Sequence, residues 1–373
     1  MKSSLVVVWL GAFAFFLSFH LLLSALPLFA RRLGASDAAI GVIMGSFAVS
    51  AMLLRPPVGW AADRWGRKPL MVGGAAVFLA CSLGYGFTAG AAGLLVVRLA
   101  HGAGMGLYPT AASALVADVA PPGRRGEYLG LFGAAGSLAM AIGPIAGVTL
   151  AGRHGFGALF LVSAAIALAA VLLTAAVTET LAHRAATPFR LATTLSRSAL
   201  QPSLVTLCLM LTYGAVVSFL PLHADRHGVN PGVFFLVYAL VLTVARGPAG
   251  RLSDRLGRAP VAGTGLLLAA VALTVLALSE GALGLALAGG AYGLAFGTAQ
   301  PALMAWCVDG VAAGDRGRAM GTFYTALELG IAIGAMSAGV VATQWGFAAT
   351  FIGTAVVALG GGALSTVVRP QRG

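Results

Sequence analysis

Charged residues are scarce in this 373-residue chain: Asp, Glu, Lys and Arg make up 9% of it, whereas hydrophobic residues make up 59%. A water-soluble domain carries about a quarter charged residues. Because this number of charges is too small to cover a water-facing surface, the composition predicts that most of the surface faces lipid. Cysteine is also scarce, with three residues in apolar runs, and neither a disulfide framework nor a cysteine metal site is expected.

The sequence also lacks any long polar stretch that could form a soluble domain. A spanning helix needs about 20 apolar residues, and the first apolar run exceeds the about 7–15 residues of a signal-peptide core. Twelve runs qualify, at about residues 5–30, 38–62, 70–88, 90–117, 126–151, 157–178, 202–223, 231–252, 260–279, 281–308, 317–342 and 346–368. We therefore expect an all-α integral membrane protein with twelve transmembrane helices. Its domains are a bundle at 1–178, a cytoplasmic linker at 179–201 and a bundle at 202–373.

The basic residues are distributed unevenly among the loops. Of 23 Lys and Arg residues, 16 lie on one side of the membrane, in alternate loops and near both termini, and 4 lie on the other. The remaining 3, Arg55, Arg98 and Arg246, fall within predicted helices. Positive charge collects on the cytoplasmic side, which predicts cytoplasmic termini in a plasma (inner) membrane. The net charge of +12 is thus a topology signal whose partner is anionic lipid, and nucleic acid is not expected.

An internal repeat with an offset of 191 residues is the strongest pattern in the chain. RPPVGWAADRWGRKP, from Arg55 to Pro69, is repeated as RGPAGRLSDRLGRAP, from Arg246 to Pro260. At the same offset, Ile142-Gly143 matches Ile333-Gly334. Because six predicted helices separate the copies, we expect two six-helix halves related by a pseudo-two-fold axis along the membrane normal.

At these residues the chain resembles the major facilitator superfamily, over essentially its whole length. The segment Gly59-x-x-x-Asp63-Arg64-x-Gly66-Arg67 is similar to the signature loop of that family between helices 2 and 3. The segment 250–258 is similar to the degenerate second copy of this loop.

Two further motifs narrow the resemblance to bacterial twelve-helix drug:proton antiporters. Arg98-x-x-His101-Gly102-x-Gly104 is similar to the helix-4 motif of proton-coupled members, with histidine where glutamine is common. Helix 5 resembles the antiporter motif, although Ala139 and Val148 stand where that motif has glycines. This departure leaves the direction of transport open.

The resemblance implies a gate at the signature loop. In it, Asp63 would meet the N-terminus of helix 11 and latch the outward-open state, where the helix dipole favours a negative charge. Arg67 would pair with Asp118, and Arg258 with Asp309. The alternative is that these charges only fix topology and solvate a loop. The expected gating residues are Gly59, Asp63, Arg64, Gly66, Arg67, Asp118, Asp254, Arg258 and Asp309.

Polar residues deep within predicted helices are candidates for proton coupling. Each is costly in a bilayer unless it faces a cavity or a partner. Glu328, His20 and Arg98 all break the repeat, as an asymmetric solute site requires. In the other half, Glu328 corresponds to Ser137 and His20 to a position near Gly214. Arg98 corresponds to Gly289 or Gly290. Glu328 lies about 16 Å into helix 11, near the midplane, where a carboxyl group could carry a proton, and His20 can change charge near neutral pH. A structural role is the alternative for each.

Polar and aromatic side chains could also line an amphipathic pocket, with ordinary helix packing as the alternative for each aromatic residue. The expected substrate-binding residues are His20, Arg98, His101, Tyr108, Tyr213, Gln300 and Tyr324. No enzyme constellation, cofactor site or metal site is expected, and we expect a monomer. The predicted function is proton-coupled export of a small amphipathic compound. The alternatives are a transporter of a polar metabolite (sugar, organic anion or metallophore) and a non-transporting membrane sensor.

Overall fold

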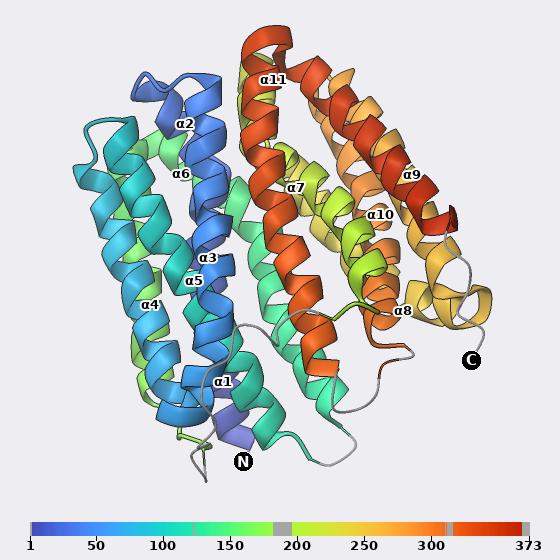
Figure 1. Cartoon of the computed structure of the whole chain (residues 1–373). Coiled ribbons are helices and arrows are strands. Elements are labelled where there is room, and N and C mark those ends of the chain that lie inside the picture. The colour runs from blue at the N-terminus through green and yellow to red at the C-terminus, as the bar shows by residue number, and fades with distance from the viewer. Residues whose placement is uncertain (1, 122–123, 182–195, 310, 312–315, 368–373) are drawn as a thin grey trace. The chain divides into compact units, whose positions relative to one another are not determined.

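The computed structural model describes residues 2–121, 124–181, 196–309, 311 and 316–367, and most of these are helical, with no strand among them (Figure 1). Backbone polar groups in a bilayer must be satisfied within the segment, so long apolar runs become helices. The elements are α1 (Lys2–Leu23), α2 (Ala25–Arg32), α3 (Asp37–Trp65), α4 (Arg67–Gly84), the 3-10 helix η1 (Tyr85–Phe87), α5 (Ala91–Val119), α6 (Arg125–Ala175), α7 (Leu200–Arg226), α8 (Gly232–Leu256), α9 (Arg258–Ala277), α10 (Ala282–Val308) and α11 (Arg316–Val367). Within these residues, 10 helices are long and apolar enough to cross a membrane.

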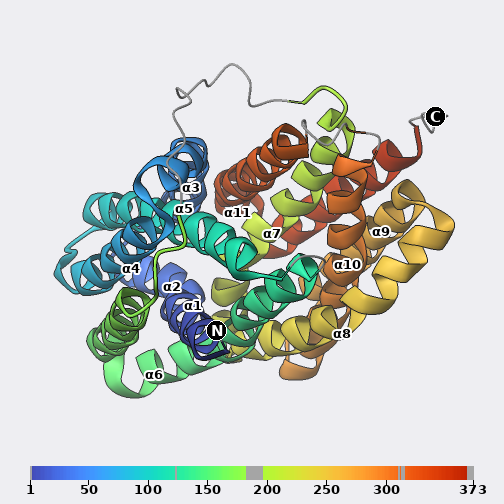
Figure 2. The ribbon, with the colours of Figure 1, turned by 90° about the horizontal axis from the view of Figure 1, so that it is seen from below.

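The helices form two compact units, which we describe separately. Unit 1 comprises residues 1–34 and 49–190, and unit 2 comprises residues 35–48 and 191–373. In unit 1, α1 packs along α6, and α4 lies between α5 and α6. In unit 2, α7 packs along α11, while α10 contacts both α8 and α9 (Figure 2).

Two helices are far longer than one bilayer crossing. α6 has 51 residues and α11 has 52, which corresponds to about 77 Å of continuous helix against a hydrocarbon core of about 30 Å. Each is broken by one glycine with non-helical backbone angles, Gly155 with φ 82° and Gly346 with φ 80°. Positive φ favours glycine, which lacks a Cβ. The two glycines are 191 residues apart, the offset of the sequence repeat.

Small residues bring paired helices into close contact. A Cβ placed on Gly147 of α6 would lie 1.9 Å from the carbonyl oxygen of Leu21 in α1. Likewise, a Cβ on Gly334 of α11 would lie 2.0 Å from the carbonyl oxygen of Leu211 in α7. Both glycines are therefore required by backbone contact between helices, which is how small residues act in membrane proteins.

Two features differ from the predicted element boundaries. The run predicted as one helix at 5–30 is interrupted at Ser24, between α1 and α2. Pro27 has no N–H for the carbonyl of Leu23, which removes one hydrogen bond of the continuous helix. Residues 35–48, predicted within the first bundle, group with unit 2, because Gly41 lies against the carbonyl of Ala335 in α11. The domain boundaries at 178 and 202 stay a prediction, and residues 182–195 of the linker lie outside the described residues.

Candidate functional site

His20 lies at the contact between α1 and α6 in unit 1. Its side chain is 6% exposed, and a Cβ placed on Gly143 would come 2.5 Å from the His20 Cβ. The His20 Nδ1 atom has no hydrogen-bond partner among the described residues. The ring of Phe19 lies beside it, with centroids 5.0 Å apart. His20 is thus a buried imidazole whose Nδ1 atom can still accept or donate a hydrogen bond.

Arg98 and His101 form a polar chain with Tyr85 inside unit 1. Arg98 is 2% exposed and His101 is fully buried. The guanidinium of Arg98 lies close enough to the Tyr85 side chain to interact with it electrostatically, and the Tyr85 hydroxyl lies 2.8 Å from His101 Nδ1. Which of these two atoms donates depends on the tautomer of the His101 ring. Phe78 packs edge-on against the imidazole, at 4.1 Å between centroids.

Tyr85 is a member of this chain that the sequence analysis missed. It lies in η1, near the end of the predicted third run at 70–88, where no motif marks it. Its partner His101 is 16 residues away, and the chain turns back on itself between α4 and α5. A tyrosine at the end of one helix, followed by a buried arginine early in the next, is the available sequence signal.

Tyr108 has the surroundings of a packing residue. It is fully buried, its ring stacks on Phe15 at 4.0 Å, and its hydroxyl lies 3.2 Å from Thr174 Oγ1. Every part of the side chain is therefore engaged within unit 1. This arrangement favours the packing alternative over contact with a substrate.

Glu328 is a buried acid in unit 2. Its side chain is 5% exposed, and no other described Asp or Glu is buried to this degree. It lies close enough to the phenol of Tyr213 in α7 for the two groups to interact electrostatically. Nearby in α11, Gly330 lies against the carbonyl of Leu207. Glu328 is thereby held at the tightly packed interface between α7 and α11.

An aromatic cluster adjoins Tyr213 in unit 2. Tyr213 lies 5.8 Å from Phe296, and Phe296 lies 4.7 Å from Tyr292. The Tyr292 hydroxyl is 2.7 Å from Thr212 Oγ1. Tyr238, which the sequence analysis did not select, completes the cluster at 5.7 Å from Tyr292.

The two other polar candidates of unit 2 differ in their contacts. Gln300 accepts a hydrogen bond of 3.2 Å from the intramembrane Arg246. Tyr324 is half-buried, and its ring meets Phe323 edge-on at 5.5 Å. Gln300 is thus paired with a charge, whereas Tyr324 keeps part of its surface accessible.

The signature loop of unit 1 is organised around Arg67. Its guanidinium forms ion pairs with Asp63 at 2.9 Å and with Asp118 at 3.1 Å, so the expected Arg67–Asp118 pair is present. Gly66, with φ 110°, connects α3 directly to α4. The neighbouring Arg64 lies over the Trp60 ring, 5.5 Å from its centroid.

The second copy of the loop repeats this arrangement in unit 2. Arg258 pairs with Asp309 at 2.9 Å and also with Asp254. Gly257, with φ 94°, connects α8 to α9. Both expected Arg–Asp pairs are therefore part of the structure. Gly59 has open space around it, since no atom lies within 4 Å of a Cβ placed on it, so close packing does not explain that glycine.

Glu179 is a second residue that the sequence analysis missed. Its carboxylate accepts hydrogen bonds from the backbone N–H groups of Arg67 and Lys68, at 3.1 and 2.9 Å. It thus caps the N-terminus of α4, where unpaired N–H groups and the helix dipole favour an anion. Partial burial opposes ionisation, but the backbone donors outweigh it and hold the pKa of Glu179 below its ordinary value. Next to it, Thr180 donates to Asp118 at 2.9 Å.

No group of three or more His, Cys, Asp or Glu side chains that could hold a metal ion occurs among the described residues. The predicted site residues instead fall into separate places. These are the His20 contact and the Arg98 chain in unit 1, the Glu328 and Gln300 neighbourhoods in unit 2, and one acid–base loop in each unit. Such an arrangement contains ionisable and aromatic groups at membrane depth, without the geometry of a covalent reaction.

The family model of the Major Facilitator Superfamily matches residues 8–246 and 203–373. The chain belongs to the Major Facilitator Superfamily. It is 24% identical to an uncharacterised MFS-type transporter of Methanocaldococcus jannaschii, over 98% of each chain. It is 26% identical to the multidrug resistance protein MdtG of Escherichia coli, over 96% of this chain and 92% of that protein.

Solved structures show the same fold. The human organic anion transporter MFSD10 superposes with a TM-score of 0.72 at 23% identity, covering 98% of this chain and 99% of that one. The nucleoside transporter NupG superposes with a TM-score of 0.83 at 14% identity, covering 97% of this chain and 98% of that one. The expected family is thus confirmed, and the protein is a multi-pass membrane transporter rather than an enzyme.

Proposed function

We propose that this transporter exports small amphipathic compounds in exchange for protons. The observation that carries the proposal is Glu328, an acid 5% exposed and 12 residues into α11. That distance corresponds to about 18 Å of helix, more than half of a hydrocarbon core of about 30 Å. An ionised carboxylate is costly there, so we propose Glu328 as the group that carries the proton.

The proposed cycle is alternating access between two six-helix halves. If each arm of α6 and of α11 crosses the membrane separately, the chain has twelve crossings and both termini lie on one side. The distribution of Lys and Arg supports a cytoplasmic location for both termini. In this topology the Arg67 and Arg258 loops lie on the cytoplasmic side, where we propose that Asp63 acts as the latch.

The proposed substrate class is supported by the aromatic residues near Glu328 and by the similarity to one relative. Tyr213 and Tyr324 offer aromatic surface close to the acid, which suits a ring-containing cation. The similarity to MdtG, named as a multidrug resistance protein, supports the same class. A second candidate is transport of an organic anion, favoured by the buried Arg98, whose positive charge could attract a carboxylate or phosphate.

The test is transport of ethidium by the purified protein in vesicles with an imposed pH gradient. Glu328→Gln keeps the shape of the side chain and removes its charge. We expect this variant to exchange ethidium passively but to lose gradient-driven accumulation. Glu280→Gln is the matched control, since Glu280 is exposed, and it should accumulate ethidium normally.

Two results would separate the alternatives. Wild-type accumulation by Glu328→Gln would rule this residue out as the proton carrier and make His20 the next candidate. Accumulation of an anionic dye but not of ethidium by the unaltered protein would favour the organic-anion candidate.

A further inference from the structure

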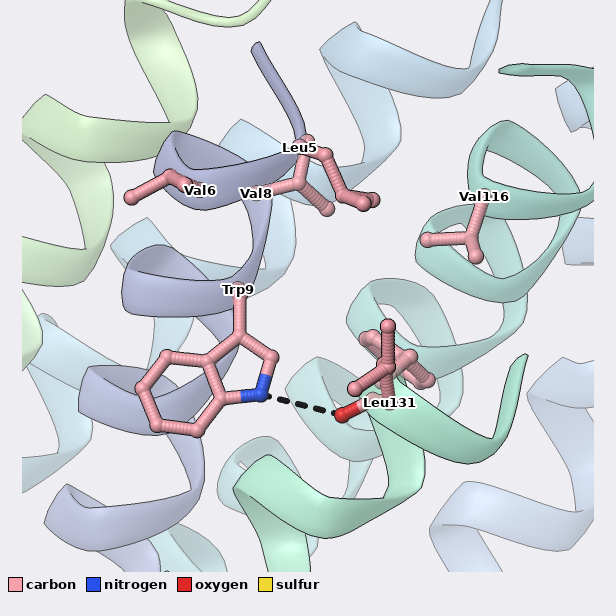
Figure 3. Close-up of a pocket in the computed structure, with 7 residues that line it drawn as sticks. Leu5, Val6, Val8, Trp9, Val116 and Leu131 are labelled. Atoms are coloured by element: carbon pink, nitrogen blue, oxygen red, sulfur yellow. Dashed lines mark hydrogen bonds between the residues drawn. The ribbon is translucent and has the colours of Figure 1, made fainter. Parts of the chain in front are cut away.

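A pocket lined by apolar side chains opens between one end of α1, the end of α5 and the beginning of α6 in unit 1 (Figure 3). Its volume is about 260 Å³. The polar group on its wall, the Trp9 indole N–H, donates to the carbonyl of Leu131 at 3.0 Å. A buried water needs two to four polar partners, and this lining offers none. The lining includes Leu5, Val8, Trp9, Val116, Leu131 and Phe132.

The dimensions of the pocket suit one hydrocarbon chain. Pockets for drug-sized ligands have about 300–1,000 Å³, so this one takes part of a molecule. At its edge, Val6 is 55% exposed and Leu131 is 47% exposed. A chain can therefore enter from the side of the helices without displacing a buried residue.

The pocket lies close to the ends of the helices that line it. Val116 lies three residues before the end of α5, and Leu131 lies six residues after the start of α6. These spacings correspond to about 5 and 9 Å of helix. The headgroup layer on each side of a bilayer is about 6 Å thick, half of the difference between total and hydrocarbon thickness. If these helix ends lie at the membrane surface, the pocket begins just below the headgroups.

The charges at the same helix ends are mostly positive. Lys2 begins α1, Arg125 begins α6 and Arg124 precedes it. The two acids at these ends are already paired, Glu127 with Arg124 at 2.6 Å and Asp118 of α5 with Arg67 at 3.1 Å. Basic residues at this level attract anionic headgroups.

We propose that this pocket binds one acyl chain of an anionic phospholipid, whose headgroup lies at the basic ends of α1 and α6. The bound lipid would fill the gap between α1 and α5 and hold these helix ends together. This site is separate from the Glu328 neighbourhood and does not depend on which solute is transported.

Tryptophan quenching by brominated lipid tests the proposal directly. The chain has five tryptophans, so the assay uses a variant that keeps Trp9 and has phenylalanine at the other four positions. A matched variant keeps Trp345, which is 67% exposed and reports contact with bulk lipid. Each is reconstituted in phosphatidylcholine with increasing fractions of phosphatidylglycerol brominated on its acyl chains.

We expect half-maximal quenching of Trp9 at a bromolipid fraction about fivefold lower than for Trp345, the effect of about one basic residue near an anionic headgroup. Brominated phosphatidylcholine should show no such preference. Val116→Phe fills the pocket and should remove the preference of the Trp9 site for brominated phosphatidylglycerol. Equal half-maximal fractions at the two tryptophans, or equal quenching of Trp9 by both bromolipids, would overturn the proposal. The comparison of lipids needs no change in the pocket, so it stands even if Val116→Phe folds poorly.

Discussion

Replacing Gly147 by alanine should separate α1 from α6. The added Cβ would lie 1.9 Å from the carbonyl oxygen of Leu21 and 2.7 Å from its carbon. An ordinary contact needs at least 3.4 Å, and backbone atoms cannot rotate away as a side chain can. The helices must therefore move apart locally by about 1.5 Å, and overpacking of this kind costs about 1–3 kcal/mol.

Gly152 supplies the matched control within the same helix. No atom lies within 4 Å of a Cβ at this position, so Gly152→Ala should be neutral or stabilising by up to about 1 kcal/mol from helix propensity. The two alanine variants should thus differ by about 1–4 kcal/mol in the free energy of unfolding.

Equilibrium unfolding in mixed micelles of mild detergent and sodium dodecyl sulfate, followed by circular dichroism, measures this difference. Gly334→Ala should behave like Gly147→Ala, because its Cβ would lie 2.0 Å from the carbonyl of Leu211. If Gly147→Ala is as stable as Gly152→Ala, the α1–α6 contact is not rigid and the reasoning fails.

Three further changes have defined outcomes. Glu179→Ala should lower the free energy of unfolding by about 1 kcal/mol, the value of a typical N-cap. Because the pKa of Glu179 is lowered in the folded state, its contribution is complete above the ordinary glutamate pKa of about 4.3 and is lost as the pH falls through the lowered value. Unfolding curves of the two proteins should therefore converge in acid, and a constant difference down to about pH 2, well below that ordinary value, would contradict this cap. Asp63→Ala should abolish ethidium transport yet change stability by less than about 0.5 kcal/mol, since an exposed i,i+4 pair is weak, whereas Glu127→Ala should transport normally. A reporter active only in the periplasm should be silent when fused at Gly373 and active near Glu280, and the reverse pattern would overturn the predicted orientation.

The helical fold was predictable from the sequence because lipid leaves few options for an apolar chain. Long apolar runs must satisfy their own backbone groups, so α7 (Leu200–Arg226) lies close to the predicted run at 202–223. The gap left between runs at 151 and 157 contains Gly155, where α6 breaks. The break at Ser24 was not predicted, because hydropathy does not register the single helix hydrogen bond that is lost at Pro27. The grouping of residues 35–48 with unit 2 depends on packing, which no local pattern records.

The candidate site was predictable only in part. Arg98 and Glu328 were identifiable because charge at membrane depth is rare, and both are buried in the structure. Tyr85 and Glu179 were missed because their roles come from partners distant in sequence, such as Arg67, which is 112 residues from Glu179. Tyr108 was selected as a candidate for a pocket, with helix packing as the alternative, and its full burial against Phe15 favours the packing alternative.

Symmetry distinguishes the residues that build the scaffold from those that could carry transport. Positions that set the backbone recur at the 191-residue offset: Gly66 and Gly257 have positive φ, as do Gly155 and Gly346. A residue repeated in both halves of one chain indicates a requirement that both halves share, which for these glycines is backbone geometry. Glu328 has no such counterpart, since Ser137 stands at its equivalent position. A buried acid present in one half alone stabilises no shared feature of the fold, yet it carries the cost of burial. We therefore propose that Glu328 acts in the transport cycle, and Glu328→Gln is the change that tests this role.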